Sequence, residues 1–418
     1  MSVATDSIDG PEGDRPSFGS SVVGRTGTTR VVGVDVARGL ALVGMFAVHI
    51  FWSLHDDYTP SLTHQVMAGH ALATFVLLAG VSLTFVTKRR SGGSWLSDRS
   101  TAAALATRAL IVAFIGLLLN SWLDPDIWVI LPYYGLMFLL SIPLLRLSSR
   151  VLLMMSIALV LLAPLLVLAT FDTDLPREGP ALGTLAHPLD LIVTLLVTGY
   201  YPVVAWMAFI CLGIVIGRLD LSSKRVAVRL TVAGGVLAAG AWQLSTLLLL
   251  KLGGLEQLRA AAPPDVSPEA ARNIIMWEPE ETVSSWWWLV ERAVDTTTPF
   301  RLVHDIGIAM ARLGVCLLIT HVRPIRRALG PVAAAGAMSL TLYTAHVVVL
   351  EQFSFHHPIQ LFVVMVYVAL TFAALWRQNG RRGPLEALVA WASARSAQWA
   401  GAASRTSREP KRELRQVD

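Results

Sequence analysis

The chain has 418 residues, of which 54% are apolar and only 15% charged, and its mean hydropathy is +0.58. A soluble domain usually carries about 25% charged residues, so this composition excludes a water-soluble globular protein and predicts an integral membrane protein. The two cysteines, Cys211 and Cys316, both lie in apolar runs, which excludes a disulfide-stapled scaffold and a zinc site built from several thiolates. The net charge of +5 is therefore interpreted against a bilayer and not as a sign of nucleic-acid binding.

Ten apolar runs are long enough to cross a membrane, because a helix needs about 20 residues to span roughly 30 Å of hydrocarbon. In chain order they are residues 32–52, 67–87, 103–122, 128–147, 151–170, 200–217, 230–250, 303–320, 328–350 and 359–376. The predicted fold class is therefore all-α, a polytopic membrane protein with about ten transmembrane helices.

The basic residues divide unevenly between the two sides that this threading defines. One side carries 25 of the 34 Lys and Arg residues and the other six, five of them in a long outer loop at 251–302. Short cytoplasmic loops collect basic residues, so both termini are predicted to be cytoplasmic. The expected organisation is a disordered cytoplasmic tail at 1–30 without a cleavable signal peptide, a transmembrane domain at 31–377, and a cytoplasmic tail at 378–418 with a short interfacial helix.

Nine of the ten histidines fall on the predicted outer side, which indicates a polar vestibule facing out of the cell. Exclusion of Lys and Arg from outer loops explains polar residues in those loops. It does not explain His49 and His346, which lie within predicted spans, where a polar side chain is costly to leave facing lipid. These two histidines are therefore candidate functional residues.

The first span combines a charged inner end with an imidazole near its outer end. Asp35 and Arg38 are one helical turn apart and can form an ion pair. Arg38 and His49 are three turns apart, about 16 Å along a helix, so both can face one groove from opposite ends. A guanidinium can form two parallel hydrogen bonds with a phosphate, which makes Arg38 a candidate anion-binding residue.

Several segments resemble a known superfamily. Arg38, ten intervening residues and His49 are similar to the arginine–histidine motif on the first helix of bacterial membrane acyltransferases that O-acylate surface glycans. Residues 336–346, GAMSLTLYTAH, are similar to that superfamily's pattern on a late helix. Residues 35–39, 130–135 and 382–386 resemble an uncharacterised bacterial branch, the domain-of-unknown-function 418/1624 branch, which is related to the lysosomal heparan-alpha-glucosaminide N-acetyltransferase.

The resemblance implies an enzyme that moves a small acyl group, acetyl first among the candidates, from cytoplasmic acyl-coenzyme A to an extracytoplasmic sugar, glycan or glycolipid. It implies location in the cell (inner or plasma) membrane and contact with membrane lipid, and it leaves a homodimer open. Acetyl-coenzyme A would be a co-substrate, and no metal is expected. The arginines that the resemblance offers for its phosphates are Arg38, Arg89, Arg90, Arg146 and Arg150.

The same resemblance leaves the general base open. His49 could serve as the base or as a transient acyl carrier. In the lysosomal enzyme, however, an asparagine stands at this place and the active histidine lies in the following loop. The candidates for the base are therefore His49, His55, His64 and His70, and His346 could orient the base or the acceptor.

Asp305 and Arg312 are two turns apart and are predicted to form a buried ion pair that braces two helices. His356 and His357 are adjacent, which argues against a shared metal ion.

Two other functions are also compatible with the sequence. Asp56–Asp57 in the first outer loop would suit a glycosyltransferase using a lipid-linked sugar. The many helices would also suit a lipid or solute transporter without covalent chemistry.

Overall fold

A computed structural model describes residues 31–51, 55, 59–88, 99–122, 127–171, 173–177, 179–259, 272–273, 275, 277, 286–294, 296–352 and 357–406. The chain divides into residues 1–30, which lie outside this set, and a second unit from Val31 onward. No β-strand occurs in the described part of the chain, so the all-α prediction is confirmed.

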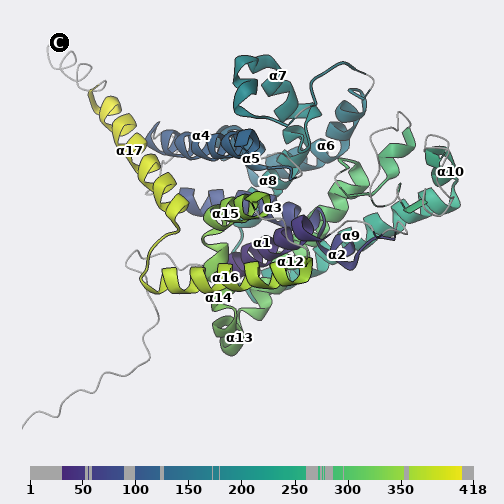
Figure 1. Cartoon of the computed structure of the whole chain (residues 1–418). Coiled ribbons are helices and arrows are strands. Elements are labelled where there is room, and N and C mark those ends of the chain that lie inside the picture. The colour runs from purple at the N-terminus through teal and green to yellow at the C-terminus, as the bar shows by residue number, and fades with distance from the viewer. Residues whose placement is uncertain are drawn as a thin grey trace, which may run out of the picture. The chain divides into compact units, whose positions relative to one another are not determined.

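The described helices are labelled in Figure 1. The first half contains α1 (Val32–Ile50), α2 (Leu62–Met67), α3 (His70–Lys88), α4 (Arg99–Trp122), α5 (Leu131–Leu144), α6 (Ser149–Leu168), η2 (Leu182–Ala186), α7 (Pro188–Val193), η3 (Thr194–Thr198) and α8 (Val203–Gly217). The second half contains α9 (Lys224–Lys251), α10 (Gly254–Arg259), η4 (Trp286–Val290), α12 (Pro299–Ile319), α13 (Arg323–Ala328), α14 (Gly330–Gly336), α15 (Ser339–Gln352), α16 (Pro358–Gln378) and α17 (Pro384–Thr406).

Each apolar run predicted from the sequence contains a helix of the described chain, but not every run is one straight span. Seven helices of the described chain are long and apolar enough to cross a membrane, and two bent pairs raise the number to nine. The run at 128–147 contains α5, which has only 14 residues. The run at 200–217 starts after a 61° bend, and the run at 328–350 is divided into α14 and α15 by a bend of 83°. The chain is therefore a multi-pass membrane protein, while the cytoplasmic placement of its termini stays a prediction.

Helix α1 lies at the centre of the elements that matter below, and it packs against α3, α12, α14, α15 and α16. The contact with α14 is unusually close. A Cβ atom added at Gly336 would lie 2.0 Å from the Asp35 carbonyl oxygen, so only glycine allows the two backbones to approach this far. Small residues let membrane helices approach closely and gain van der Waals packing energy. This matters in a bilayer, because lipid provides no hydrophobic driving force for helix association.

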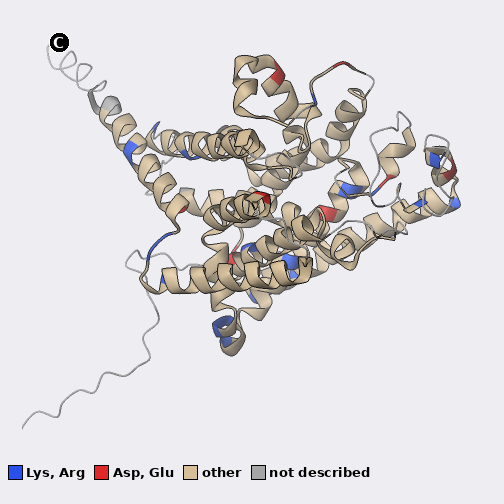
Figure 2. Cartoon of the chain, viewed as in Figure 1, with Lys and Arg blue, Asp and Glu red and all other residues tan. Residues whose placement is uncertain are grey.

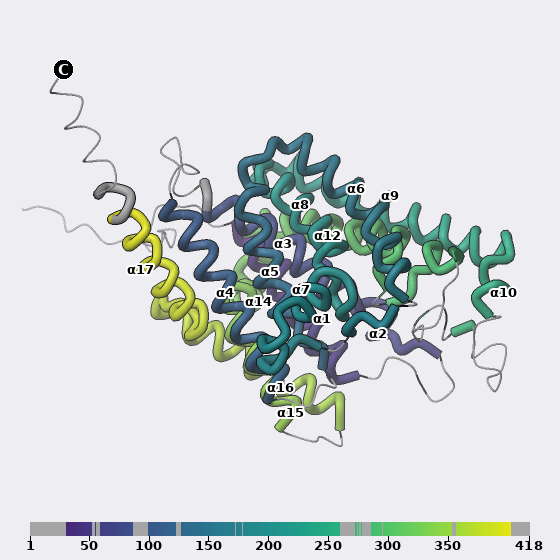
Figure 3. The backbone as a smooth tube through the Cα atoms, turned by 90° about the horizontal axis from the view of Figure 1, so that it is seen from above, coloured from purple at the N-terminus to yellow at the C-terminus, as the bar shows by residue number. Residues whose placement is uncertain are grey.

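The C-terminal helix is longer than the short helix that was expected, and its interfacial position stays a prediction. Helix α17 has 23 residues and lies alongside α4, as Figures 1 and 3 both show. One apolar side chain of this helix, Val389, is buried, whereas Trp391 and Trp399 are exposed. Helix α17 is thus packed against the helix bundle by part of its surface.

Candidate active site

Two imidazoles from distant parts of the sequence meet between α1 and α15. Nδ1 of His49 lies 2.9 Å from Nε2 of His346, and the two rings stack with their centroids 5.2 Å apart. His49 is half-buried and His346 is 2% exposed. We call these two residues the imidazole pair.

The surroundings of His346 favour one direction of the hydrogen bond within the pair. Its ring contacts those of Phe46 and Tyr343. Its Nδ1 atom makes no hydrogen bond within the described structure, and the backbone carbonyl groups of Leu342 and Tyr343, one turn earlier on α15, act on this imidazole. A carbonyl can only accept, so this environment favours the proton on Nδ1 and leaves the lone pair on Nε2.

The bend between α14 and α15 exposes backbone groups that a continuous helix would satisfy internally. On the α14 side, Nη1 of Arg38 donates to the Gly336 carbonyl at 3.3 Å. On the α15 side, Oε1 of Glu386 accepts from the backbone N–H groups of Leu340 at 2.8 Å and Thr341 at 3.1 Å. A cation therefore sits at the negative end of one half-helix and a carboxylate at the positive end of the other.

The segments that carried the family resemblance converge on this bend. Residues 35–39 reach it through Arg38, and residues 382–386 reach it through Glu386. The segment 130–135 reaches it through the backbone N–H of Ile130, which donates to the Tyr343 hydroxyl at 3.4 Å. The bent pair α14–α15, which carries His346, is thus the common meeting point of separate parts of the sequence.

Arg38 belongs to a group of charges near the same bend. Its Nη1 atom lies 3.4 Å from Oδ1 of Asp35, and its Nη2 atom donates to Ser82 Oγ on α3 at 2.5 Å. The charges of Arg38, Glu386 and Arg382 act on a further arginine, Arg108 of α4. Arg108 is exposed and its guanidinium lies 5.7 Å from the Phe138 ring centroid.

The sequence reasoning missed Arg108, although a signal was present. It lies well inside an apolar helix, and an ionisable residue inside a span is a functional candidate by default. Arg146 and Arg150, which were named instead, flank the turn between α5 and α6 and are exposed. Arg89 and Arg90 lie outside the described residues.

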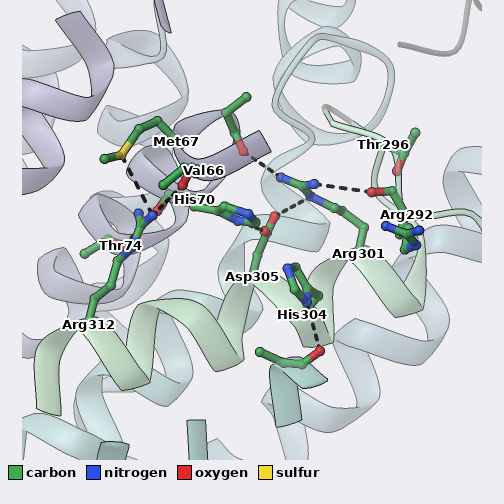
Figure 4. Close-up of polar contacts among 12 residues, drawn as sticks. Val66, Met67, His70, Thr74, Arg292, Thr296, Arg301, His304, Asp305 and Arg312 are labelled. Carbon is green, nitrogen blue, oxygen red and sulfur yellow. Dashed lines mark hydrogen bonds and ion pairs between the residues drawn. The ribbon is translucent and has the colours of Figure 1, made fainter. Parts of the chain in front are cut away.

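A second polar cluster lies between α3, α9 and α12 (Figure 4). Nδ1 of His70 donates to Asp305 Oδ1 at 2.7 Å, and Nε of Arg301 donates to Asp305 Oδ2 at 2.8 Å. The rings of His70 and His304 are 5.1 Å apart, and His304 Nδ1 donates to the Ala238 carbonyl at 2.9 Å. We call His70, Arg301, His304 and Asp305 the Asp305 network.

This network corrects the predicted pairing of Asp305 with Arg312. Arg301 forms the ion pair instead, because four residues bring two side chains together on a helix more closely than seven. Arg312 donates to the Val66 carbonyl at 2.6 Å. Asp305 still connects two helices, since it also binds His70 of α3.

The other predicted histidines lie apart from the imidazole pair in their contacts. His55 is exposed, and its Nδ1 atom donates to the Thr59 carbonyl at 2.9 Å. His64 is buried, and its Nε2 atom donates to the Trp277 carbonyl at 3.0 Å. Asp56, Asp57 and His356 lie outside the described residues. No group of three or more His, Cys, Asp or Glu side chains suited to a metal was found among the residues that the structure describes.

Beside the Asp305 network, the loop after η4 carries two buried charged residues outside the spanning helices. Burial raises the pKa of the Glu291 carboxyl well above its ordinary value. Burial, with a smaller contribution from Arg301, lowers the pKa of Arg292 to about 10. The Arg292 guanidinium lies 3.3 Å from the Trp242 ring centroid, and its backbone carbonyl accepts from Arg301 Nη1 at 3.3 Å.

Comparison with known families identifies the chain. A family model described as heparan-alpha-glucosaminide N-acetyltransferase, catalytic, matches residues 30–249, more than half of the sequence. The chain belongs to the heparan-alpha-glucosaminide N-acetyltransferase-like family of transmembrane acyltransferases. A second model, described as a protein of unknown function (DUF418), matches residues 274–396. The search of curated proteins gave no match.

Membership of this family makes the protein an acyltransferase, and it confirms the predicted enzyme class. The two matched regions meet in both polar clusters. His49 and His70 lie in the N-acetyltransferase match, whereas His346 and Asp305 lie in the second match. Each cluster therefore requires both regions of this acyltransferase.

Proposed function

We propose that the protein transfers an acetyl or other small acyl group from cytoplasmic acyl-coenzyme A to a hydroxyl or amine of an extracytoplasmic sugar, glycan or glycolipid. The observation that carries this proposal is the imidazole pair. Family membership supports acyl transfer as the kind of reaction, and the pair supplies a proton acceptor inside the helix bundle.

The tautomers of the pair assign a role to each histidine. Because the backbone carbonyl groups of Leu342 and Tyr343 favour a proton on Nδ1 of His346, His346 accepts a hydrogen bond on Nε2, and His49 donates it from Nδ1. The Nε2 atom of His49 then carries the free lone pair. His49 is the general base, and His346 orients its ring and fixes its tautomer.

The reaction balances without a metal or a redox partner. Nε2 of His49 takes the proton from the acceptor hydroxyl or amine as the oxygen or nitrogen attacks the thioester carbonyl. A C–O or C–N bond forms and the C–S bond breaks. The proton then passes to the departing sulfur, so that free coenzyme A and neutral His49 result.

Arg38 and Arg108 are the proposed contacts of the acyl-coenzyme A phosphates. They come from different helices, interact electrostatically and lie near the bend that carries the His346 half-helix. Two guanidinium groups can share the charge of a phosphate, which replaces their mutual repulsion by attraction. Arg38 would also keep its contact with the α14 carbonyl, so it links donor binding to the position of α15.

The test uses membranes containing the protein and acetyl-coenzyme A labelled in the acetyl group, followed by extraction of the labelled product. Wild type is expected to label a glycolipid or glycan fraction, and the His49→Ala variant is expected not to. The matched control is His187→Ala, since His187 is exposed and outside both polar clusters. Equal labelling by wild type and His49→Ala would refute the role of His49, and absence of labelled product from all three would refute the proposed donor.

A further inference from the structure

Two neighbouring pockets lie where α16 ends and the chain turns into α17. The larger has a volume of about 490 Å³, and its lining includes Arg381, Arg382 and Trp391. The smaller, about 270 Å³, is lined in part by Phe372 and Leu375 of α16. Trp376 and Arg381 line both pockets, so the two form one continuous surface, which we call the α16–α17 surface.

The turn that forms this surface is held by its own contacts. Gly380 adopts a φ of +67°, which lets the chain reverse directly after α16. Nε1 of Trp376 donates to the Arg382 carbonyl at 2.8 Å, which ties the tryptophan ring to the backbone of the turn. On the α17 side, the Arg395 guanidinium lies 4.7 Å from the Trp391 ring centroid. The rings are therefore positioned before any ligand arrives.

The charge of the surface has one sign. Arg381 and Arg382 are exposed, and the described lining includes no acidic residue. The nearby carboxylate of Glu386 is engaged by the N-terminus of α15. Figure 2 shows the basic residues on the link between α16 and α17, beside the largely uncharged α16. Exposed paired arginines match the geometry and charge of a phosphate group.

The other half of the surface is apolar and continues along α16. Only 11% of the apolar window of this helix is buried inside the protein. Its exposed large side chains include Ile359, Val363, Val364, Tyr367, Val368 and Leu375. In a membrane-spanning helix such a face contacts acyl chains, and tryptophan at the end of a span marks the headgroup level. The surface thus extends from the level of the acyl chains, at Leu375, to the level of the headgroup phosphates, at Arg381 and Arg382.

We infer that the α16–α17 surface binds one anionic phospholipid. Arg381 and Arg382 bind the headgroup phosphate, Trp376 and Trp391 pack against the glycerol region, and an acyl chain lies along Phe372 and Leu375. A free phosphate or a nucleotide would satisfy the arginines but leave the apolar half uncovered. The inference is independent of the acyl transfer proposed above.

Native mass spectrometry of the full-length protein tests the inference, after titration in detergent with phosphatidylglycerol or phosphatidylcholine. Wild type is expected to retain phosphatidylglycerol in preference. Each arginine near a membrane surface contributes roughly fivefold to binding of an anionic lipid, so the Arg381→Gln/Arg382→Gln variant should bind it about 25-fold more weakly. The matched control removes the same charge from α13, as Arg326→Gln/Arg327→Gln, and should change binding less than about twofold.

Two additional measurements distinguish lost binding from failed folding, and a lipid from a soluble phosphate. The charge-conserving variant Arg381→Lys/Arg382→Lys should keep most of the preference if the glutamine variant fails through lost charge and not through misfolding. Equal retention of the two lipids by wild type, or equal losses in the glutamine variant and its control, would overturn the inference. Displacement of phosphatidylglycerol by adenosine 3′,5′-bisphosphate or inorganic phosphate alone would also overturn it, because it would make the surface a site for a soluble phosphate.

Discussion

The imidazole pair and the Asp305 network use the same kind of residue in opposite ways. In the network, Asp305 accepts on both carboxylate oxygens, and Arg301 also donates to the backbone carbonyl of Ala68 at 2.9 Å. In the pair, no acid takes part, and His346 Nδ1 is without a hydrogen bond in the described structure. A network with its charges compensated stabilises helix packing, whereas an imidazole pair without a fixed counter-charge is suited to gaining and losing a proton.

The largest expected difference between the two clusters is in activity. Because His49 is the proposed base, the His49→Ala variant should lose about 10²- to 10⁴-fold in kcat, measured with labelled acetyl-coenzyme A, and should unfold close to the wild-type temperature. The His70→Ala variant should lose more stability than activity. The reverse result, an active His49→Ala and a stable but inactive His70→Ala, would transfer the role of base to His70.

The second expected difference is in stability. The Asp305→Ala variant leaves Arg301 and His70 buried without their carboxylate, which should cost about 3–5 kcal/mol in the free energy of unfolding. Thermal unfolding in detergent measures the loss, with His346→Ala as the comparison from the imidazole pair. If Asp305→Ala unfolds like wild type, the network has no structural role.

A smaller effect should show whether Glu386 positions His346 for catalysis or only stabilises the packing at the bend. Glu386→Ala removes the carboxylate that accepts two N–H groups of α15, and loss of a helix cap costs about 0.5–2 kcal/mol. As a positioning residue for His346, Glu386 should affect kcat more than KM. Glu386→Gln retains an acceptor oxygen and should recover much of kcat. Equal losses in kcat for both variants at unchanged stability would argue against positioning through these hydrogen bonds.

The last effect concerns pH and the loop that borders the Asp305 network. Since burial raises the pKa of Glu291, the unfolded chain ionises first as pH rises above the ordinary value of 4.5. Wild-type stability should therefore fall with rising pH from there up to the raised pKa, by at most about 1.4 kcal/mol per pH unit. Glu291→Gln should remove this decrease in thermal midpoint measured against pH. A variant with the wild-type pH profile would contradict the assignment.

The sequence predicted the helices better than it predicted their interruptions. Apolar runs of about 20 residues identify spans because hydrocarbon thickness imposes that length. The bend at 337–338 contains no proline that would predict it from the sequence. It depends on tertiary contacts: Gly336 lies against the backbone of Asp35, and side chains from other helices bind the backbone N–H and C=O groups that the bend leaves unpaired. Local pattern cannot contain that information.

The sequence identified several residues of the site, but it did not identify which residues they contact. His49 and His346 stood out because both lie inside apolar runs, yet 297 residues separate them and only the fold shows that they touch. Asp305 was recognised as a paired acid, but the predicted partner was Arg312, seven residues away, and the structure pairs it with Arg301, four residues away. Arg108 was overlooked because its neighbours on α4 are so apolar, although for the same reason its charge was informative.

The bend also has a consequence for how the protein is made. The half-helix bearing His346 is capped by a glutamate from the last helix of the described chain, whereas the arginine of the first transmembrane helix caps α14 on the other side of the bend. During synthesis, Glu386 is added after the whole of α15, so the N–H groups of α15 begin without their carboxylate. We therefore expect the two imidazoles to reach their final geometry as a late event in biogenesis, after α17 docks.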